Sequence, residues 1–175
     1  MTAYDAAVAQ WRQDPEAYWL AAAQGLEWVR SPSRALDANQ GMFGRWFADG
    51  VLNTCHNALD RHVAAGGGEH VAILYDSPVT GVIERITYAQ MTARTARLAG
   101  ALAARGVSKG DRIIIYMPMV PEAAIAMLAC ARLGAIHSVV FGGFAAAELA
   151  ARINDATPKA VISASCGLEP GRVVA

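Results

Sequence analysis

From residue 71 onward, short apolar runs alternate with stretches of helical length. The apolar runs predict strands at 71–75, 82–87, 112–117, 136–141 and 160–163, the first two as a hairpin. The intervening stretches predict helices at 87–106, 121–134 and 145–155. This alternation is typical of βαβ units, whose strands are parallel and whose crossovers are right-handed. The predicted fold class is therefore α/β, with 112–117 buried on both faces of a parallel sheet.

The first 65 residues have helical spacing without strand-like runs. Two short helices are predicted within 4–36, the second opened by Asp14 as N-cap and Pro15 at the first turn. A further helix is predicted over 53–62, ahead of three consecutive glycines. We therefore expect a helical N-terminal segment over 1–65 and the start of an α/β domain over 66–175.

Three of the four tryptophans fall in the helical segment: Trp11, Trp19 and Trp28. Large rings at helical spacing are more often packing residues than a ligand platform. We expect them to hold this segment against a larger body.

Composition and charge exclude several classes of protein. The chain is 54% hydrophobic and 17% charged, with 15 basic and 15 acidic side chains. Intrinsic disorder requires low hydrophobicity and high net charge, and nucleic-acid binding usually shows a basic excess. No apolar run approaches the ~20 residues of a membrane span, and the first residues lack the cationic start of a signal peptide. We expect a cytoplasmic protein with no nucleic-acid or membrane partner.

The cysteines and histidines do not form a recognisable metal or disulfide pattern. Cys55, Cys130 and Cys166 are far apart, without a C-x-x-C pair, and are expected to be small buried hydrophobes. His56 and His62 are six residues apart and do not share a helix face, so no metal ligand is predicted.

No catalytic residue is predicted. The chain contains neither the G-x-x-x-x-G-K-[ST] phosphate loop nor the G-x-S-x-G nucleophile elbow. Its two lysines, Lys109 and Lys159, directly precede strands, where solvated turn lysines are expected.

Two loops at the carboxyl ends of predicted strands are candidate binding segments. Phe141, Gly142 and Gly143 lie where a strand gives way to a helix, so backbone N–H groups there could face an anion. The residues alone fit a tight turn equally well. Arg172 follows the last strand and could pair with a phosphate, although the residues favour a solvated side chain.

Several long motifs carry a resemblance to a known family. They are residues 52–62 (LNTCHNALDRH), 110–122 (GDRIIIYMPMVPE) and 133–144 (LGAIHSVVFGGF). Together they resemble the start of an acetyl-CoA synthetase-type enzyme, one of the AMP-forming acyl-CoA synthetases of the adenylate-forming superfamily. Residues 163–172 (SASCGLEPGR) more closely resemble the propionyl-CoA synthetases.

The resemblance implies a two-step ligase. ATP and a short-chain carboxylate would give an acyl-adenylate and pyrophosphate, and the CoA thiol would then displace AMP. ATP, CoA and Mg²⁺ are implied for the full-length enzyme, and no cofactor is assigned to this chain by itself.

The resemblance also implies roles for individual residues. Phe141, Gly142 and Gly143 match the family loop near the CoA nucleotide, and Arg172 matches an arginine that meets a CoA phosphate. Glu169 stands where acetyl-CoA synthetases tend to have another arginine, a departure that is consistent with a propionyl-type subgroup.

The family's phosphate loop, Mg²⁺-binding motif and catalytic lysine have no match in these 175 residues. We therefore expect the chain to be the N-terminal portion of a longer enzyme and to be inactive alone. The alternative is a complete, non-enzymatic α/β module that binds a nucleotide or CoA. An open sheet edge would favour association into an oligomer.

Overall fold

The computed structural model describes residues 2–143, 145–169 and 172–174, with side chains described as far as Gly167. The chain divides into two compact units, Met1–Asn53 (unit 1) and Thr54–Ala175 (unit 2). No helix among the described residues is long and apolar enough to cross a membrane. The cytoplasmic location expected from the sequence stays a prediction.

Unit 1 begins with two capped helices, α1 (Ala3–Gln13) and α2 (Pro15–Ala23), as predicted. The Asp14 carboxylate accepts a hydrogen bond from the Ala17 N–H at 2.9 Å, and Pro15 occupies the first turn. The Asp14 carboxylate satisfies one of the N–H groups that a helix start leaves unpaired, and Pro15 has no N–H group to satisfy. Two short antiparallel strands follow, β1 (Leu36–Asp37) and β2 (Arg45–Trp46).

Aromatic rings pack on one another within unit 1. The ring centroids of Trp19 and Trp46 are 5.5 Å apart, and those of Trp28 and Phe47 are 5.8 Å apart. The Trp28 indole N–H donates to the Ala23 carbonyl at 2.8 Å. These contacts join α2 to the β1–β2 hairpin. The expected role of the tryptophans against a larger body stays a prediction.

Unit 2 starts with two π-helices, η1 (His56–Asp60) and η2 (Val63–Gly67), where a helix over 53–62 is predicted. The predicted helix is confirmed, and the structure adds its π-helical turns. Cys55 and Leu59 are buried, and a spacing of four suits an α-helix or a π-helix, so the apolar pattern cannot separate them. Each helix needs tertiary support: Asp60 accepts two hydrogen bonds from Arg132, at 2.7 and 2.9 Å.

An antiparallel hairpin comes next, formed by β3 (Val71–Ser77) and β4 (Val82–Thr87). Helix α3 (Tyr88–Ala104) follows directly, with the Thr87 and Gln90 side chains in the reciprocal arrangement of a capping box. β3 is two residues longer than predicted, because Asp76 and Ser77 pair with Ile83 and Val82 rather than opening the turn.

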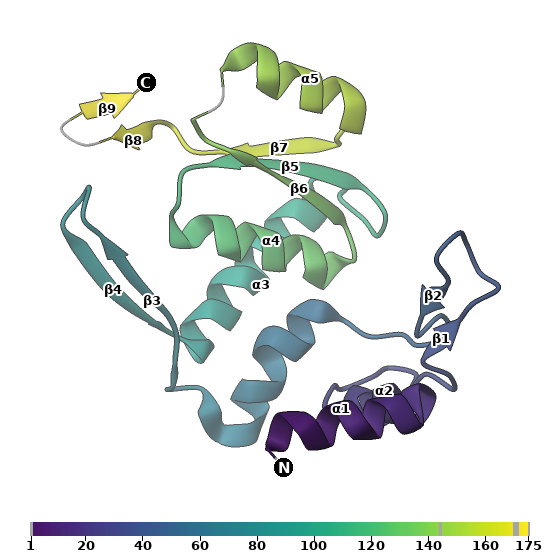
Figure 1. Cartoon of the computed structure of the whole chain (residues 1–175). Helices are drawn as coiled ribbons and strands as arrows, with labels where there is room; N and C mark the ends of the chain where they lie inside the picture. The colour runs from purple at the N-terminus through teal and green to yellow at the C-terminus, as the bar shows by residue number, and fades with distance from the viewer. Residues whose placement is uncertain (1, 144, 170–171, 175) are drawn as a thin grey trace. The chain divides into compact units, whose positions relative to one another are not determined.

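The remaining elements form a parallel sheet with helices on both faces. β5 (Arg112–Met117), α4 (Pro121–Leu133), β6 (Ile136–Phe141), α5 (Ala146–Ala156) and β7 (Ala160–Ser163) follow in sequence. The strand order is β6-β5-β7, and both pairings are parallel. Figure 1 shows α4 and α5 on opposite faces of the sheet. The predicted α/β class and parallel βαβ units are confirmed.

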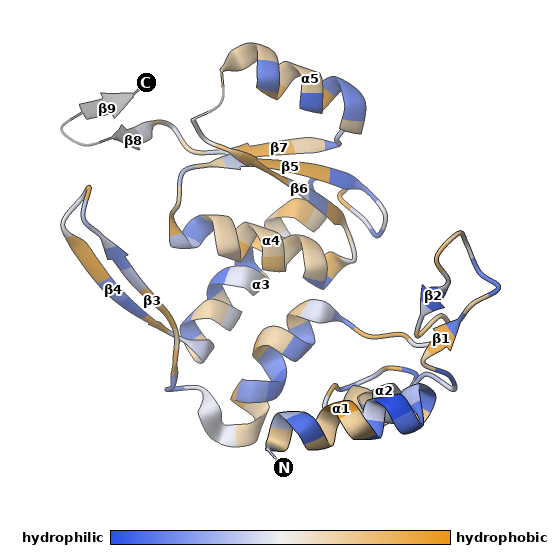
Figure 2. Cartoon of the chain, in the orientation of Figure 1, coloured by the Kyte–Doolittle hydropathy of each residue, from blue (hydrophilic) through white to orange (hydrophobic). Residues whose placement is uncertain are grey.

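The core of unit 2 lies around β5. Ile113, Ile114 and Ile115 are fully buried, and Ile113 and Ile115 cluster with residues of α3 and α4. Apolar positions run along β5, β6 and β7 (Figure 2). β6 is an edge strand among the described residues, and Val140 is its one buried residue. The prediction of burial on both faces, made for 112–117, is therefore confirmed by β5.

Two short strands lie where a loop is predicted after β7. β8 (Gly167–Glu169) pairs antiparallel with β9 (Arg172–Val174). Pro170 and Gly171 lie outside the described residues. A Pro-Gly pair between short runs favours a tight turn, which is the signal for a hairpin that the sequence offers.

At the amino end of the sheet, Lys159 joins three segments. Its ammonium donates to the Gly106 carbonyl and, at 3.1 Å, to the Asp111 carboxylate. The same carboxylate oxygen accepts the Ser108 N–H at 2.8 Å and the Ser108 hydroxyl at 2.9 Å. The expectation of a solvated turn lysine is confirmed, since Lys159 is exposed directly before β7, and the structure adds contacts with residues about 50 positions earlier.

This cluster makes stability depend on acid pH. Hydrogen bonds from Ser108 and Lys159 hold the pKa of Asp111 below its ordinary value of 3.8. A lowered folded-state pKa contributes stability above the unfolded-state value, and that contribution is lost as pH falls through the folded-state pKa. Asp111→Asn should therefore lower the free energy of unfolding at pH 7. At pH 2–3 the free energies of unfolding of the variant and of the unsubstituted chain should differ by less than they do at pH 7.

Urea titrations at both pH values measure this. The exposed Glu69 is the matched control, and Glu69→Gln should leave the pH dependence unchanged. A difference between Asp111→Asn and the unsubstituted chain that is equal at the two pH values would contradict the assignment.

Candidate functional site

The topology of the sheet locates a crevice. β5 and β6 are adjacent and parallel, yet β5 leads into α4 and β6 leads into α5, on opposite faces (Figure 1). The two connections therefore diverge beyond the carboxyl ends of the strands. In open α/β sheets, ligands bind at such a switch point.

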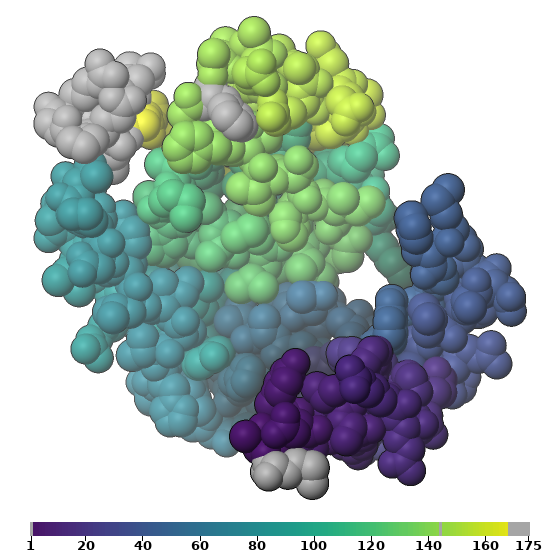
Figure 3. Space-filling view, in the orientation of Figure 1, coloured from purple at the N-terminus to yellow at the C-terminus, as the bar shows by residue number. Residues whose placement is uncertain are grey.

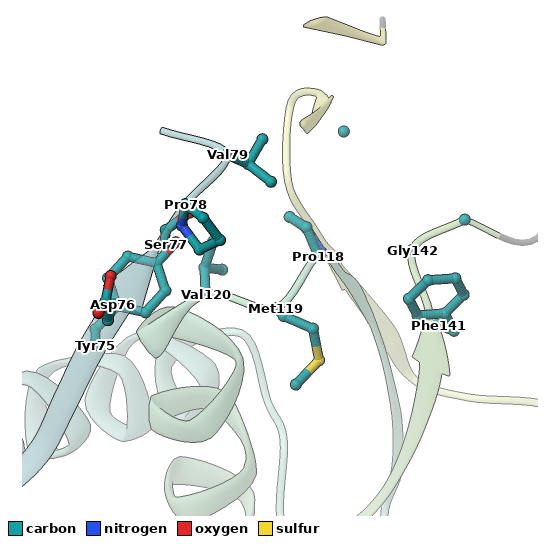
Figure 4. Close-up of a pocket in the computed structure, with 12 residues that line it drawn as sticks. Tyr75, Asp76, Ser77, Pro78, Val79, Pro118, Met119, Val120, Phe141 and Gly142 are labelled. Atoms are coloured by element: carbon teal, nitrogen blue, oxygen red, sulfur yellow. The ribbon is translucent and has the colours of Figure 1, made fainter. Parts of the chain in front are cut away.

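A cavity of about 310 Å³ lies at this crevice. Its walls come from four segments: the β3–β4 hairpin, the connection after β5, the end of β6 with the connection that follows it, and the start of β8. The lining residues are Tyr75, Asp76, Ser77, Pro78, Val79, Pro118, Met119, Val120, Phe141, Gly142, Gly143 and Gly167. In Figure 4 the hairpin residues stand on one side, Phe141 and Gly142 on the other, and Pro118 and Met119 between them. The volume is at the lower end of the ~300–1,000 Å³ typical of small-molecule sites.

Gly142 is required by the close approach of two backbones. A Cβ at this position would lie 2.9 Å from the carbonyl carbon and oxygen of Met117 and from the nitrogen of Pro118. A Cβ at Gly143 would meet the Phe141 ring at 2.6 Å, a contact that a side chain can relieve by rotating. At both glycines the cavity is lined by backbone, which is the arrangement that lets a ligand approach the main chain.

The described lining is mostly apolar. Phe141 is 58% exposed and Met119 is 83% exposed, so both leave apolar surface at the crevice. Asp76 is the one charged residue among the described lining residues. The site therefore offers shape and apolar contact, together with glycine backbone at one end.

A second, more apolar cavity of about 630 Å³ adjoins the first, on the side of α4. The two share the hairpin and the connection after β5. Met117, Met127, Val139 and Leu74 are added to its lining. The face of the sheet between the hairpin and β6 is therefore an extended apolar surface.

The structure brings together three of the five predicted site residues. Phe141, Gly142 and Gly143 all line the 310 Å³ cavity. Glu169 and Arg172 face each other across the β8–β9 backbone pairing, and their side chains lie outside the described residues. Gly167, the first residue of β8, lines the same cavity, so the hairpin starts at the crevice. The ligand roles of all five residues stay predictions.

Sequence reasoning missed two walls of the cavity. The connection 118–120 lies inside a motif that carries the family resemblance, and its position after a buried strand could have placed it at the crevice. The β3–β4 hairpin lies about 40 residues earlier than the connection after β5 and offers no such signal, because only the tertiary fold brings it there.

The cysteines do not contribute to the site. Cys55 and Cys130 are fully buried, as predicted, and burial raises the pKa of both thiols. Cys166 is half-buried and precedes β8. Among the described residues, no group of three or more His, Cys, Asp and Glu side chains could hold a metal ion.

A parallel sheet with helices on both faces and a glycine-bearing crevice at its switch point defines an α/β protein of the nucleotide-binding type. Comparison with known families makes this specific. Residues 59–173 match the family described as AMP-binding enzyme, and residues 4–58 match the one described as Acetyl-coenzyme A synthetase N-terminus. The chain belongs to the AMP-binding enzyme family, and the resemblance to acetyl-CoA synthetase-type enzymes is confirmed.

Individual relatives agree with this assignment. The chain is 59% identical over 161 residues to an uncharacterized protein of Pseudomonas aeruginosa, covering 92% of this chain and 26% of that protein. It is 51% identical to the mitochondrial acyl-CoA synthetase short-chain family member 3 of Bos taurus, covering 92% and 24%. It is 48% identical to the acetyl-coenzyme A synthetase of Streptomyces coelicolor, covering 93% and 25%. The chain thus spans about a quarter of the length of these curated relatives.

Alanine substitutions test the close approach at the crevice. Gly142→Ala should lower the free energy of unfolding by about 1–3 kcal/mol, because the added Cβ meets backbone rather than a movable side chain. Gly100→Ala is the matched control: it lies in α3 with nothing within 4 Å of the added Cβ, and should stabilise by about 0.4–1 kcal/mol.

Urea unfolding of the two variants measures both effects. Equal stabilisation by the two substitutions would show that the ends of β5 and β6 are farther apart than described here.

Proposed function

We propose that this chain forms the N-terminal part of a short-chain acyl-CoA synthetase. The whole enzyme joins a carboxylate to the α-phosphate of ATP, which gives an acyl-adenylate and releases pyrophosphate. The CoA thiol then attacks the acyl carbon and AMP leaves, so that the acyl group ends as a thioester. Adenylation is needed because a carboxylate oxygen is a poor leaving group at neutral pH, whereas AMP is a good one.

The observation that carries this proposal is the glycine-lined crevice at the switch point of the sheet, within a chain that matches both segments of the family. We assign Phe141, Gly142 and Gly143 to the CoA nucleotide and Arg172 to a CoA phosphate. The cavity lined by Gly142 and Gly143 supports this assignment, because backbone without side chains can approach a ligand closely. Glu169 removes one cationic contact that acetyl-CoA synthetases tend to have.

We propose propionate as the preferred carboxylate and acetate as the second. The support is the segment 163–172, which resembles propionyl-CoA synthetases and carries Glu169. The division into a lead-in over 1–65 and the start of the adenylating domain over 66–175 belongs to the same proposal. ATP, CoA and Mg²⁺ are the substrates and metal ion of the whole enzyme, and no described residue is assigned to the metal.

The second candidate is a non-enzymatic module that binds a nucleotide or CoA. The observation that favours it is that unit 2 has its own buried core around β5. The family match favours the enzyme, since it includes the lead-in as well as the sheet.

Activity of the protein encoded by the complete reading frame separates the two. It should release AMP only when ATP, CoA and a short carboxylate are all present. One methylene in an apolar pocket is worth about 10–200-fold in specificity, so kcat/KM for propionate should exceed that for acetate at least about tenfold. The 175-residue chain alone should release no AMP.

A coupled AMP assay with acetate, propionate and butyrate gives all of these values. Carboxylate-independent binding of CoA without AMP release by the complete protein would favour the module. AMP release by the 175-residue chain would show that it contains catalytic residues that the sequence did not reveal.

A further inference from the structure

We propose that the β3–β4 hairpin is the second wall of the CoA site, with Val79 at its tip packing against the base of the CoA nucleotide. This inference rests on the proposed function, and it gives a role to a segment that has none so far.

The geometry places the hairpin and the glycine loop on opposite sides of one cavity. Pro78 and Val79 line it from the hairpin, and Phe141 and Gly142 line it from the end of β6 (Figure 4). Met119 lies between the two sides. In the space-filling view the hairpin runs along one flank of unit 2, coloured blue-teal (Figure 3). A ligand held at Gly142 would therefore have the hairpin as its nearest facing surface.

The chemistry of the cavity selects which part of CoA enters it. Asp76 is the one charged residue of the described lining, and a carboxylate repels phosphate. The phosphates are thus expected away from Asp76, at the glycine end of the cavity. The part of CoA that occupies the cavity is therefore an uncharged group that packs against Phe141 and Met119. The ring of Phe141 and the thioether of Met119 suit a flat heteroaromatic base.

The hairpin is anchored at its base, which fixes the position of the wall. Ile86 is fully buried and packs with Ile73 in the cluster around Cys55. Farther along, Arg94 of α3 donates to the Glu84 carboxylate at 2.9 Å. Between Glu84 and the turn, the hydrogen bonds among described residues are those within the hairpin itself, so the tip can adjust to a ligand while its base stays in place.

The face of the hairpin supplies a matched control. Ile83 pairs with Asp76, is 69% exposed and lines neither cavity, whereas Val79 lines the smaller one. Both positions are exposed enough to accept a larger side chain. Val79→Trp would fill the cavity and Ile83→Trp would add the same bulk outside it.

The test uses the complete enzyme and separates its two half-reactions. ATP–pyrophosphate exchange driven by the carboxylate reports adenylation, which does not need CoA, and thioester formation reports the CoA step. For Val79→Trp, the factor by which the KM for CoA rises should be at least five times the factor by which the ATP–pyrophosphate exchange rate falls. For Val79→Ala the KM for CoA should rise about two- to fivefold, and Ile83→Trp should change neither value by more than about twofold.

The KM for 4′-phosphopantetheine, which lacks the base, identifies the contacted part of the ligand. It should change less than twofold in Val79→Trp. An equal rise for both thiols would overturn the assignment to the base. If Val79→Trp reduces ATP–pyrophosphate exchange and thioester formation equally, polypeptide rather than ligand fills the cavity. That result would also overturn the assignment to the base.

Gly142→Ala in the same enzyme distinguishes failure of the inference from failure of the proposed site. If Gly142→Ala raises the KM for CoA and the Val79 variants do not, the glycine loop binds CoA and the hairpin does not. If neither changes that KM, the CoA site lies elsewhere and both proposals fail.

Discussion

The burial of β5 is the constraint on which the rest of unit 2 depends. Its three isoleucines are fully buried, and its two edges pair with β6 and β7. Full burial of each such side chain is worth about 1.5–3 kcal/mol relative to exposure, so this short strand supplies a large share of the driving force. Helices α4 and α5 then lie on opposite faces, because the connections β5-α4-β6 and β6-α5-β7 move in opposite directions along the sheet and right-handed crossovers in opposite directions cover opposite faces.

The crevice follows from that arrangement. Once β5 and β6 lead to opposite faces, their carboxyl ends are left without a covering helix, and the chain after each must turn within a few residues. The turn after β6 brings Gly142 against the Met117–Pro118 backbone, at a distance that excludes a Cβ. The glycine that the resemblance assigns to a ligand is therefore also a packing requirement, and its presence alone does not distinguish the two roles. The cavity beside it is the feature that favours a ligand.

The sequence predicts those parts of the fold that local chemistry controls. Thr87 with Gln90 marks the start of α3, Pro121 marks the start of α4 and Gly134 marks its end, and the structure adds that Gly134 has a left-handed conformation. The features it does not predict depend on distant partners. The π-helices share their apolar spacing with an α-helix, Lys159 meets residues about 50 positions away, and the hairpin reaches the crevice only through tertiary packing. Of the site, the glycine loop could be predicted because it follows a strand, whereas the wall opposite it could not.

The charge of the crevice constrains how an anionic ligand can be held. An ordinary phosphate site combines several cationic side chains, but the described lining supplies one acid and no base. Affinity for a nucleotide must therefore come from glycine backbone, from apolar contact with its base and from residues next to the crevice. In the proposed site, the apolar tip of the hairpin would add binding energy through packing, which is insensitive to salt, and Arg172 is proposed to add the electrostatic part. Acetyl-CoA synthetases tend to have a second arginine where this chain has Glu169. In the proposed CoA site, the absence of that cation would lower the electrostatic share of the binding energy and make the apolar wall correspondingly more important.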